Sequence, residues 1–221
     1  QFMLTEEAHH LSVGENGIGR IVQRTAELMR DGTDPRSVGA IPLEIIQKYI
    51  NEWCSASHDL FGGEDSTNAA ESFASGIKGR YREGDGLYQD PRALEQVFTT
   101  QIEEGGKLVD REIPLRRAMN ALLLKSYFAD CTRIIARWHR ILKKHDVEAT
   151  IIQPNLRFNR SIGIHADKSY DLVGNPMARE DLDKMMSGMF PTEEDRAYVM
   201  SCQVKVTERG KIANWIAPPK A

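Results

Sequence analysis

The chain has 221 residues, of which 41% are hydrophobic and 28% charged, a balance typical of a globular domain and not of a disordered segment. Its 29 basic and 32 acidic residues give a net charge of -3, so no basic excess indicates nucleic-acid binding, and no apolar run is long enough to span a membrane. Three scattered cysteines without a Cys-x-x-Cys pair argue against a zinc site or a disulfide framework, and we expect buried free thiols in a cytoplasmic protein.

The first expected element is a helix over residues 2–30, because apolar residues recur at helical spacing toward its end. Residues 2–4 look like the interior of a helix without a preceding cap, so we expect the chain to be truncated at its N-terminus. Gly14, Gly17 and Gly19 each cost roughly 1 kcal/mol of helix propensity, and a bend or close packing there would explain them.

The middle of the chain predicts two further helices and a mixed stretch. One helix follows Pro42 and reaches the break after Phe61, and a second spans about 65–77 with caps at its start. Residues 79–90 are expected to form a loop. Residues 91–113 are mixed, with a possible short helix at 91–98 and a turn at Gly105-Gly106.

The longest helix is expected from Pro114 to Lys144, because proline suits a first helical turn and apolar residues recur throughout. The later sequence is predicted to contain strand-like segments and two short helices, the second capped by Thr192 with Asp195 three residues on. These strand-like segments are 149–153, 158–164, 170–173 and 203–207, and the helices are 178–189 and 192–203. We therefore predict a mainly α protein, with a helical portion over 1–147 and a small irregular, β-containing appendage over 148–221.

One motif carries sharp chemistry. Glu6, Glu7, His9 and His10 contain two overlapping Glu-x-x-His patterns. A glutamate and a histidine three residues apart project from one face of a helix, where both can bind the same metal ion. In ferritin-like diiron bundles two helices each supply Glu-x-x-His and two others each supply a carboxylate. The alternative is a solvated helix face, but the apolar residues around the motif suggest a largely buried helix.

The chain resembles the oxygenase components of benzoyl-CoA 2,3-epoxidases. The resemblance covers segments spread over nearly the whole chain, namely 2–10, 13–15, 17–20, 59–64, 66–70, 76–80 and 213–219. His58 departs from the family pattern, in which an apolar residue is expected. The resemblance implies a ferritin-like helical bundle, of which this chain is the C-terminal portion, with the other iron ligands upstream.

The same resemblance implies a diiron enzyme that uses O2 to insert one oxygen atom into the ring of benzoyl-CoA or a related aryl-CoA. Its electrons would come from an NADPH-dependent flavin and iron–sulfur reductase component. Related diiron enzymes often have Asp-Glu-x-Arg-His, which makes Glu7 and His10 the expected iron ligands and leaves Glu6 and His9 as the alternative pair. We expect no catalytic residues beyond these ligands, and expect the chain alone to be inactive.

A second candidate site is the cluster of Arg157, Arg160 and Lys168 beside Phe158 and Tyr170. Cations next to aromatic rings suit an adenine nucleotide with phosphates, so Arg157 and Arg160 are candidate substrate-binding residues, with an ordinary exposed turn as the equal alternative. The alternative for the whole chain is a non-catalytic ferritin-like interaction module or an inactive fragment.

Overall fold

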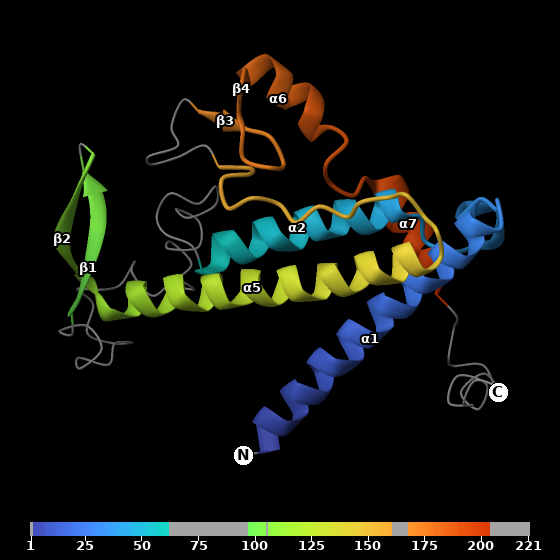
Figure 1. The fold of residues 1–221 in the computed structure, drawn as a ribbon, viewed down its shortest axis with the longest axis horizontal. Coiled ribbons are helices and arrows are strands. Elements are labelled where there is room, and N and C mark those ends of the chain that lie inside the picture. The colour runs from blue at the N-terminus through green and yellow to red at the C-terminus, as the bar shows by residue number, and fades with distance from the viewer. Residues whose placement is uncertain (1, 62–96, 105, 161–167, 204–221) are drawn as a thin grey trace. The chain divides into compact units, whose positions relative to one another are not determined.

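The computed structural model describes residues 2–61, 97–104, 106–160 and 168–203 (Figure 1). Its elements are α1 (Phe2–Arg30), η1 (Pro35–Val38), α2 (Leu43–Phe61), β1 (Val97–Glu104), β2 (Lys107–Pro114), α5 (Leu115–Lys144), β3 (Ser169–Tyr170), β4 (Pro176–Met177), α6 (Arg179–Met186) and α7 (Glu193–Ser201). The predicted mainly α fold with a small β-containing part is confirmed. No helix within these residues is both long and apolar enough to cross a membrane.

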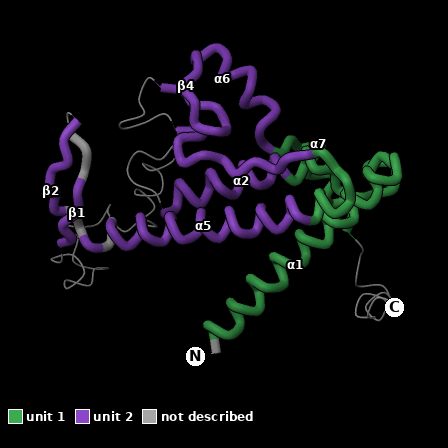
Figure 2. Tube along the Cα trace, viewed as in Figure 1, with its two compact units in different colours: residues 1–46, 141–148, 191–221 green, residues 47–140, 149–190 purple. Residues whose placement is uncertain are grey.

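The chain divides into two compact units, whose segments alternate along the sequence (Figure 2). Unit 1 contains Gln1–Ile46, Ile141–Glu148 and Pro191–Ala221, and unit 2 contains Gln47–Arg140 and Ala149–Phe190. The boundary expected near residue 147 stays a prediction.

The core of unit 1 forms around the second half of α1. Val22, Thr25 and Ala26 are fully buried, and the Thr25 hydroxyl donates a hydrogen bond of 2.7 Å to the carbonyl of Ile41. The Tyr198 hydroxyl of α7 donates a 2.7 Å hydrogen bond to the carbonyl of Ala40. These two hydrogen bonds connect residues 40 and 41, which follow η1, to α1 and to α7.

Helix α7 begins as the sequence predicts. The Thr192 hydroxyl accepts a hydrogen bond from the Asp195 backbone, and the Asp195 carboxylate accepts one from the Thr192 backbone. This reciprocal arrangement is a capping box, which satisfies two donors that the first turn of a helix leaves without partners.

The glycines of α1 do not interrupt it. The helix runs unbroken from Phe2 to Arg30, and a Cβ built on Gly14 or Gly17 would meet no atom within 4 Å. Close packing therefore does not explain these two glycines within the described residues, and the alternative, a bend, stays a prediction.

In unit 2, residues from α2 and α5 share a small apolar cluster. Cys54 packs with Leu124 and Phe128, all three less than 10% exposed. The His58 ring stacks on Phe128 with 4.6 Å between ring centroids, and the side chain is only 4% exposed. His58 is therefore a packing histidine that fills a core position with an aromatic face.

A β-hairpin occupies residues 97–114, where the sequence predicts a mixed stretch. β1 and β2 pair antiparallel from Val97 opposite Pro114 to Glu104 opposite Lys107, and Gly106 takes a φ of 79° at the turn. The expected turn is confirmed at Gly106. The short helix expected at 91–98 is wrong at residues 97 and 98, and its other residues, like the helix at 65–77 and the loop at 79–90, lie outside the described residues.

The strand expected at 149–153 is absent, because side chains from two helices take the place of a neighbouring strand. The Gln47 amide of α2 accepts a 2.7 Å hydrogen bond from the Ile152 backbone N–H and donates one of 2.7 Å to its carbonyl. On α5, Nε2 of His139 lies 2.9 Å from the Ile151 carbonyl oxygen. The Thr132 hydroxyl donates a hydrogen bond of 2.6 Å to the side-chain oxygen of Gln153.

The other strand expectations fail for most of their length. Residues 158–160 contain turns, with Asn159 at a φ of 57°, and residues 161–167 lie outside the described part. Of 170–173 only Tyr170 is in a strand, because the chain turns at Gly174 and returns as β4. Gln203 is not in a strand, and the rest of that segment is not described. The two short helices are confirmed as α6 and α7 with slightly narrower bounds.

Candidate metal centre

Helix α1 places Glu7 and His10 one turn apart, so that their side chains meet. Oε2 of Glu7 lies 3.7 Å from Nδ1 of His10. Glu6 and His9 precede Glu7 and His10 by one residue each, and no ion pair joins Glu6 to His9 within the described part of α1. The rings of His9 and His10 are 6.5 Å apart and tilted by 49°.

The separation of Glu7 and His10 fits two ligands of one ion. A first-row divalent ion such as zinc binds nitrogen and oxygen at about 2.0–2.2 Å, so two ligand atoms on the same ion lie about 3–4 Å apart. The 3.7 Å between Oε2 and Nδ1 falls in this range. A carboxylate with an imidazole is also the donor set that iron sites use. The pair therefore fits one part of a metal centre without rearrangement of α1.

Two ligands do not complete such a centre. Among residues 2–61, 97–104, 106–160 and 168–203, no three His, Cys, Asp or Glu side chains lie close enough together to hold a metal ion. A diiron centre built on Glu7 and His10 thus needs ligands from beyond the described residues.

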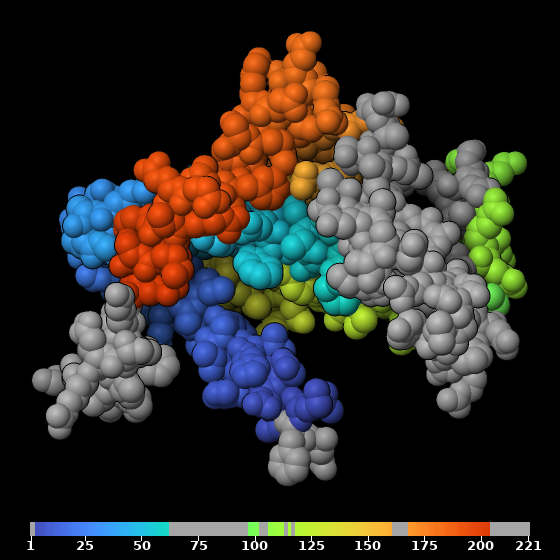
Figure 3. Space-filling view, turned by 180° about the vertical axis from the view of Figure 1, so that it is seen from behind, coloured from blue at the N-terminus to red at the C-terminus, as the bar shows by residue number. Residues whose placement is uncertain are grey.

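The motif lies on an exposed stretch of helix, which corrects the expectation of burial. Met3 and Leu4 are each 77% exposed and Leu11 is 74% exposed. The first turns of α1, dark blue in Figure 3, lie open at the surface of unit 1. The apolar residues that suggested a buried helix face solvent because no described residue covers them.

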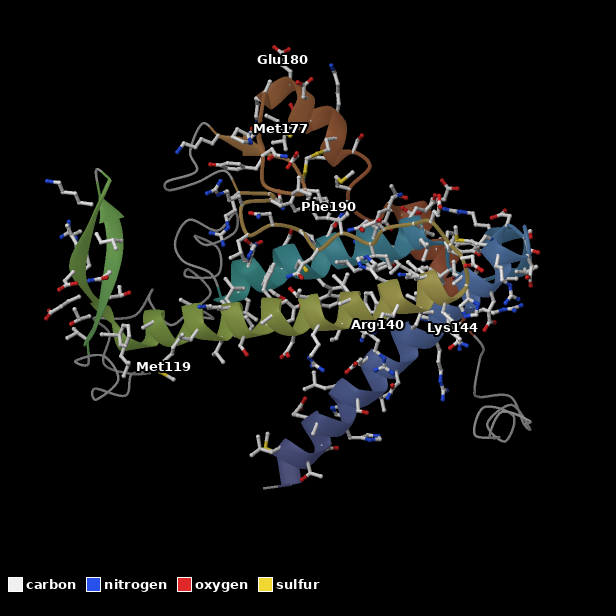
Figure 4. All side chains as sticks on the ribbon, viewed as in Figure 1. Met119, Arg140, Lys144, Met177, Glu180 and Phe190 are labelled. Atoms are coloured by element: carbon white, nitrogen blue, oxygen red, sulfur yellow. The ribbon has the colours of Figure 1, made fainter. Side chains whose placement is uncertain are left out.

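The second candidate site is brought together only in part. The Arg157 guanidinium lies 5.9 Å from the centre of the Tyr170 ring and is exposed, whereas the Arg160 side chain is only 9% exposed. Phe158 is 2% exposed, and the centre of its ring lies 5.9 Å from that of Phe190, which is labelled in Figure 4. Phe158 and Tyr170 are thus buried, and Arg157 and Lys168 are the exposed cations of the cluster.

One pair of chemically reactive residues was missed. Cys54 of α2 and Cys131 of α5 are hydrogen-bonded to each other in unit 2. The hydrogen bond from Cys54, with a second from Tyr127, lowers the pKa of Cys131 to about 7 although partial burial opposes the shift. The pairing raises the pKa of Cys54, and burial adds to that rise. No local spacing could have revealed this pair, because the two cysteines lie far apart in sequence.

Comparison with known proteins bears directly on the predicted resemblance. The chain is 38% identical over 224 aligned residues to benzoyl-CoA oxygenase component B of Aromatoleum evansii. The resemblance predicted from the sequence is confirmed. The alignment covers 99% of this chain but 47% of that protein, so the chain spans about half the length of the relative it matches. No family model matches the chain.

Proposed function

We propose that the complete protein is the oxygenase component of an aromatic acyl-CoA epoxidase that acts on benzoyl-CoA. The similarity of nearly the whole chain to a benzoyl-CoA oxygenase component B carries this proposal. In it, Glu7 and His10 bind iron of a diiron centre within a ferritin-like helical bundle. The 3.7 Å approach of these two side chains supports them over Glu6 and His9.

The diiron centre, when bound, supplies the activation of O2 that an unreactive aromatic ring requires. The contribution of this chain is to position two ligands. The Glu7 carboxylate offsets the positive charge of the metal, and the neutral His10 imidazole binds through one ring nitrogen. Because α1 is continuous across both positions, the two ligands keep a fixed spacing.

The exposed apolar residues of α1 have a role in the same proposal. The relative is about twice as long as this chain, and we place the remaining iron ligands in the other half of the complete protein. Helices from that half would cover Met3, Leu4 and Leu11, which then exclude water from the site. Water exclusion strengthens electrostatic interactions and prevents loss of reactive species.

We extend the proposal to the substrate and to the supply of electrons. The name of the relative, a component B, supports a separate partner component, and we propose an NADPH-dependent reductase with flavin and iron–sulfur groups. For the coenzyme A portion of the substrate, we assign phosphate contacts to Arg157 and Arg160. Arginine forms bidentate hydrogen bonds with phosphate, and the exposure of Arg157 beside Tyr170 supports this placement.

The competing function is a non-catalytic ferritin-like interaction module. The open apolar surface of α1 is the observation that favours it, because such surfaces often bind another protein. The complete protein should be purified with its reductase and supplied with NADPH, benzoyl-CoA and 18O2. Our proposal expects two irons per chain and a benzoyl-CoA product that carries one 18O atom. A folded protein without iron and without labelled product would favour the interaction module.

A further inference from the structure

The Cys54 and Cys131 pair lies apart from the candidate metal centre and has no role in the proposed oxygenase chemistry. Cys54 is 2% exposed in the apolar cluster with Leu124 and Phe128. Cys131 is partly exposed on α5, and its sulfur accepts hydrogen bonds from Cys54 and Tyr127. One thiol is therefore accessible from solvent while the other is held against it from the interior.

We propose that Cys54 and Cys131 are a peroxide-reactive dithiol that closes to a disulfide joining α2 to α5. Accessible and resolving cysteines in contact are the arrangement that reversible thiol oxidation requires. Both residues lie in unit 2, so the contact does not depend on the placement of unit 1.

The reaction proceeds in two balanced steps. The Cys131 thiolate attacks one oxygen of hydrogen peroxide and is oxidised to a sulfenic acid, while the O–O bond breaks and the other oxygen leaves as water after taking up a proton. The Cys54 thiol then attacks the Cys131 sulfur, and its proton leaves with the displaced hydroxyl as a second water. Two thiols and one peroxide thus give one disulfide and two waters.

Exposure decides which cysteine reacts first, because Cys54 is 2% exposed whereas Cys131 is partly exposed. The hydrogen bonds act in the same direction, because they lower the pKa of Cys131 and the thiolate is the nucleophile in thiol oxidation. A lower pKa also reduces intrinsic nucleophilicity. Access from solvent therefore carries the expectation that Cys131 is oxidised before Cys54.

The alternative is that the two cysteines are only small apolar residues that fill space between helices. Peroxide treatment separates the two readings, because thiols that only fill space stay reduced, whereas a reactive pair closes to a disulfide with an S–S bond of about 2.05 Å.

The test uses the complete protein, reduced and then treated with hydrogen peroxide at pH 7 in the presence of a metal chelator. Remaining thiols are blocked with iodoacetamide, and the protein is digested with trypsin without reduction. We expect mass spectrometry to find residues 49–78 joined to residues 126–133 with the loss of two hydrogens, and to find them separated by dithiothreitol. The Cys202 peptide, residues 197–205, is the matched internal control and should remain alkylated.

Two variants keep the result interpretable. In Cys54→Ser the resolving thiol is absent, so Cys131 should accumulate as a sulfenic acid that dimedone traps. In Cys131→Ser, Cys54 should remain alkylated after the same treatment. Recovery of Cys54 and Cys131 as free thiols in the wild type, or oxidation of Cys202 at an equal rate, would overturn the proposal.

Discussion

Replacement of Gln47 by methionine tests the contact that holds the segment after α5 in unit 2. The Gln47 amide makes three hydrogen bonds, two with the Ile152 backbone at 2.7 Å and one of 2.8 Å to Oδ1 of Asn51. Methionine keeps the length of the side chain and removes every polar atom. Each hydrogen bond contributes about 0.5–1.5 kcal/mol, so the free energy of unfolding should fall by about 2–4 kcal/mol.

Equilibrium unfolding in urea measures this change. With an m-value of about 2 kcal/mol/M, the unfolding midpoint should fall by about 1–2 M. Gln23→Met is the matched control, because Gln23 is exposed on α1 and makes one 2.9 Å hydrogen bond to Glu27. The control should change stability by less than about 0.5 kcal/mol. Equal effects of the two substitutions would refute the view that Gln47 holds Ile152.

Three further predictions address other parts of the chain. Thr192→Ala removes the capping box of α7 and should lower the free energy of unfolding by about 1 kcal/mol, while Thr192→Ser should restore it. Tyr198→Phe removes the hydrogen bond to Ala40 but keeps the ring near Arg36, and should cost about 1 kcal/mol in the same unfolding assay. Arg157→Ala should raise KM for the acyl-CoA more than it lowers kcat, and an unchanged KM would remove Arg157 from the site. Arg160→Ala should raise KM in the same way and, because Arg160 is buried, should in addition lower the free energy of unfolding.

The helices were predictable because their signals are local. The apolar periodicity and the proline at residue 114 placed α1, α2 and α5 within a residue or two of their observed ends. The capping residues Thr192 and Asp195 located the start of α7. Each of these signals depends on neighbours within one or two helical turns, which a single sequence displays.

The hairpin over 97–114 was missed although a signal was present. Val97, Phe98 and Thr99 favour strands, and a pair of glycines follows within a few residues, as in many hairpins. The charges along β2 concealed the pattern, because neither strand has one uniformly apolar face. In the structure Val97 and Leu108 are more than half exposed, which explains the weak alternation.

The contacts that could not be predicted join residues remote in sequence. Gln47 and Ile152 are 105 residues apart, and nothing near either residue indicates the other. The segment at 149–153 has strand-forming side chains, yet its backbone partners are side chains of α2 and α5. The exposure of the Glu-x-x-His motif was also not predictable, because apolar residues around a motif are equally typical of a buried helix and of a helix whose apolar face binds another chain segment.

Iron content of two variants of the complete protein tests the central claim most directly. Glu7 and His10 lie on one face of α1, with 3.7 Å between Oε2 of Glu7 and Nδ1 of His10. His9 precedes His10 on the same exposed turn, so His9→Ala is a matched control for His10→Ala. We predict that His10→Ala loses its iron and its epoxidation activity. We predict that His9→Ala keeps its iron, with turnover reduced by at most about 10–100-fold. Iron lost from His9→Ala but retained in His10→Ala would contradict the assignment.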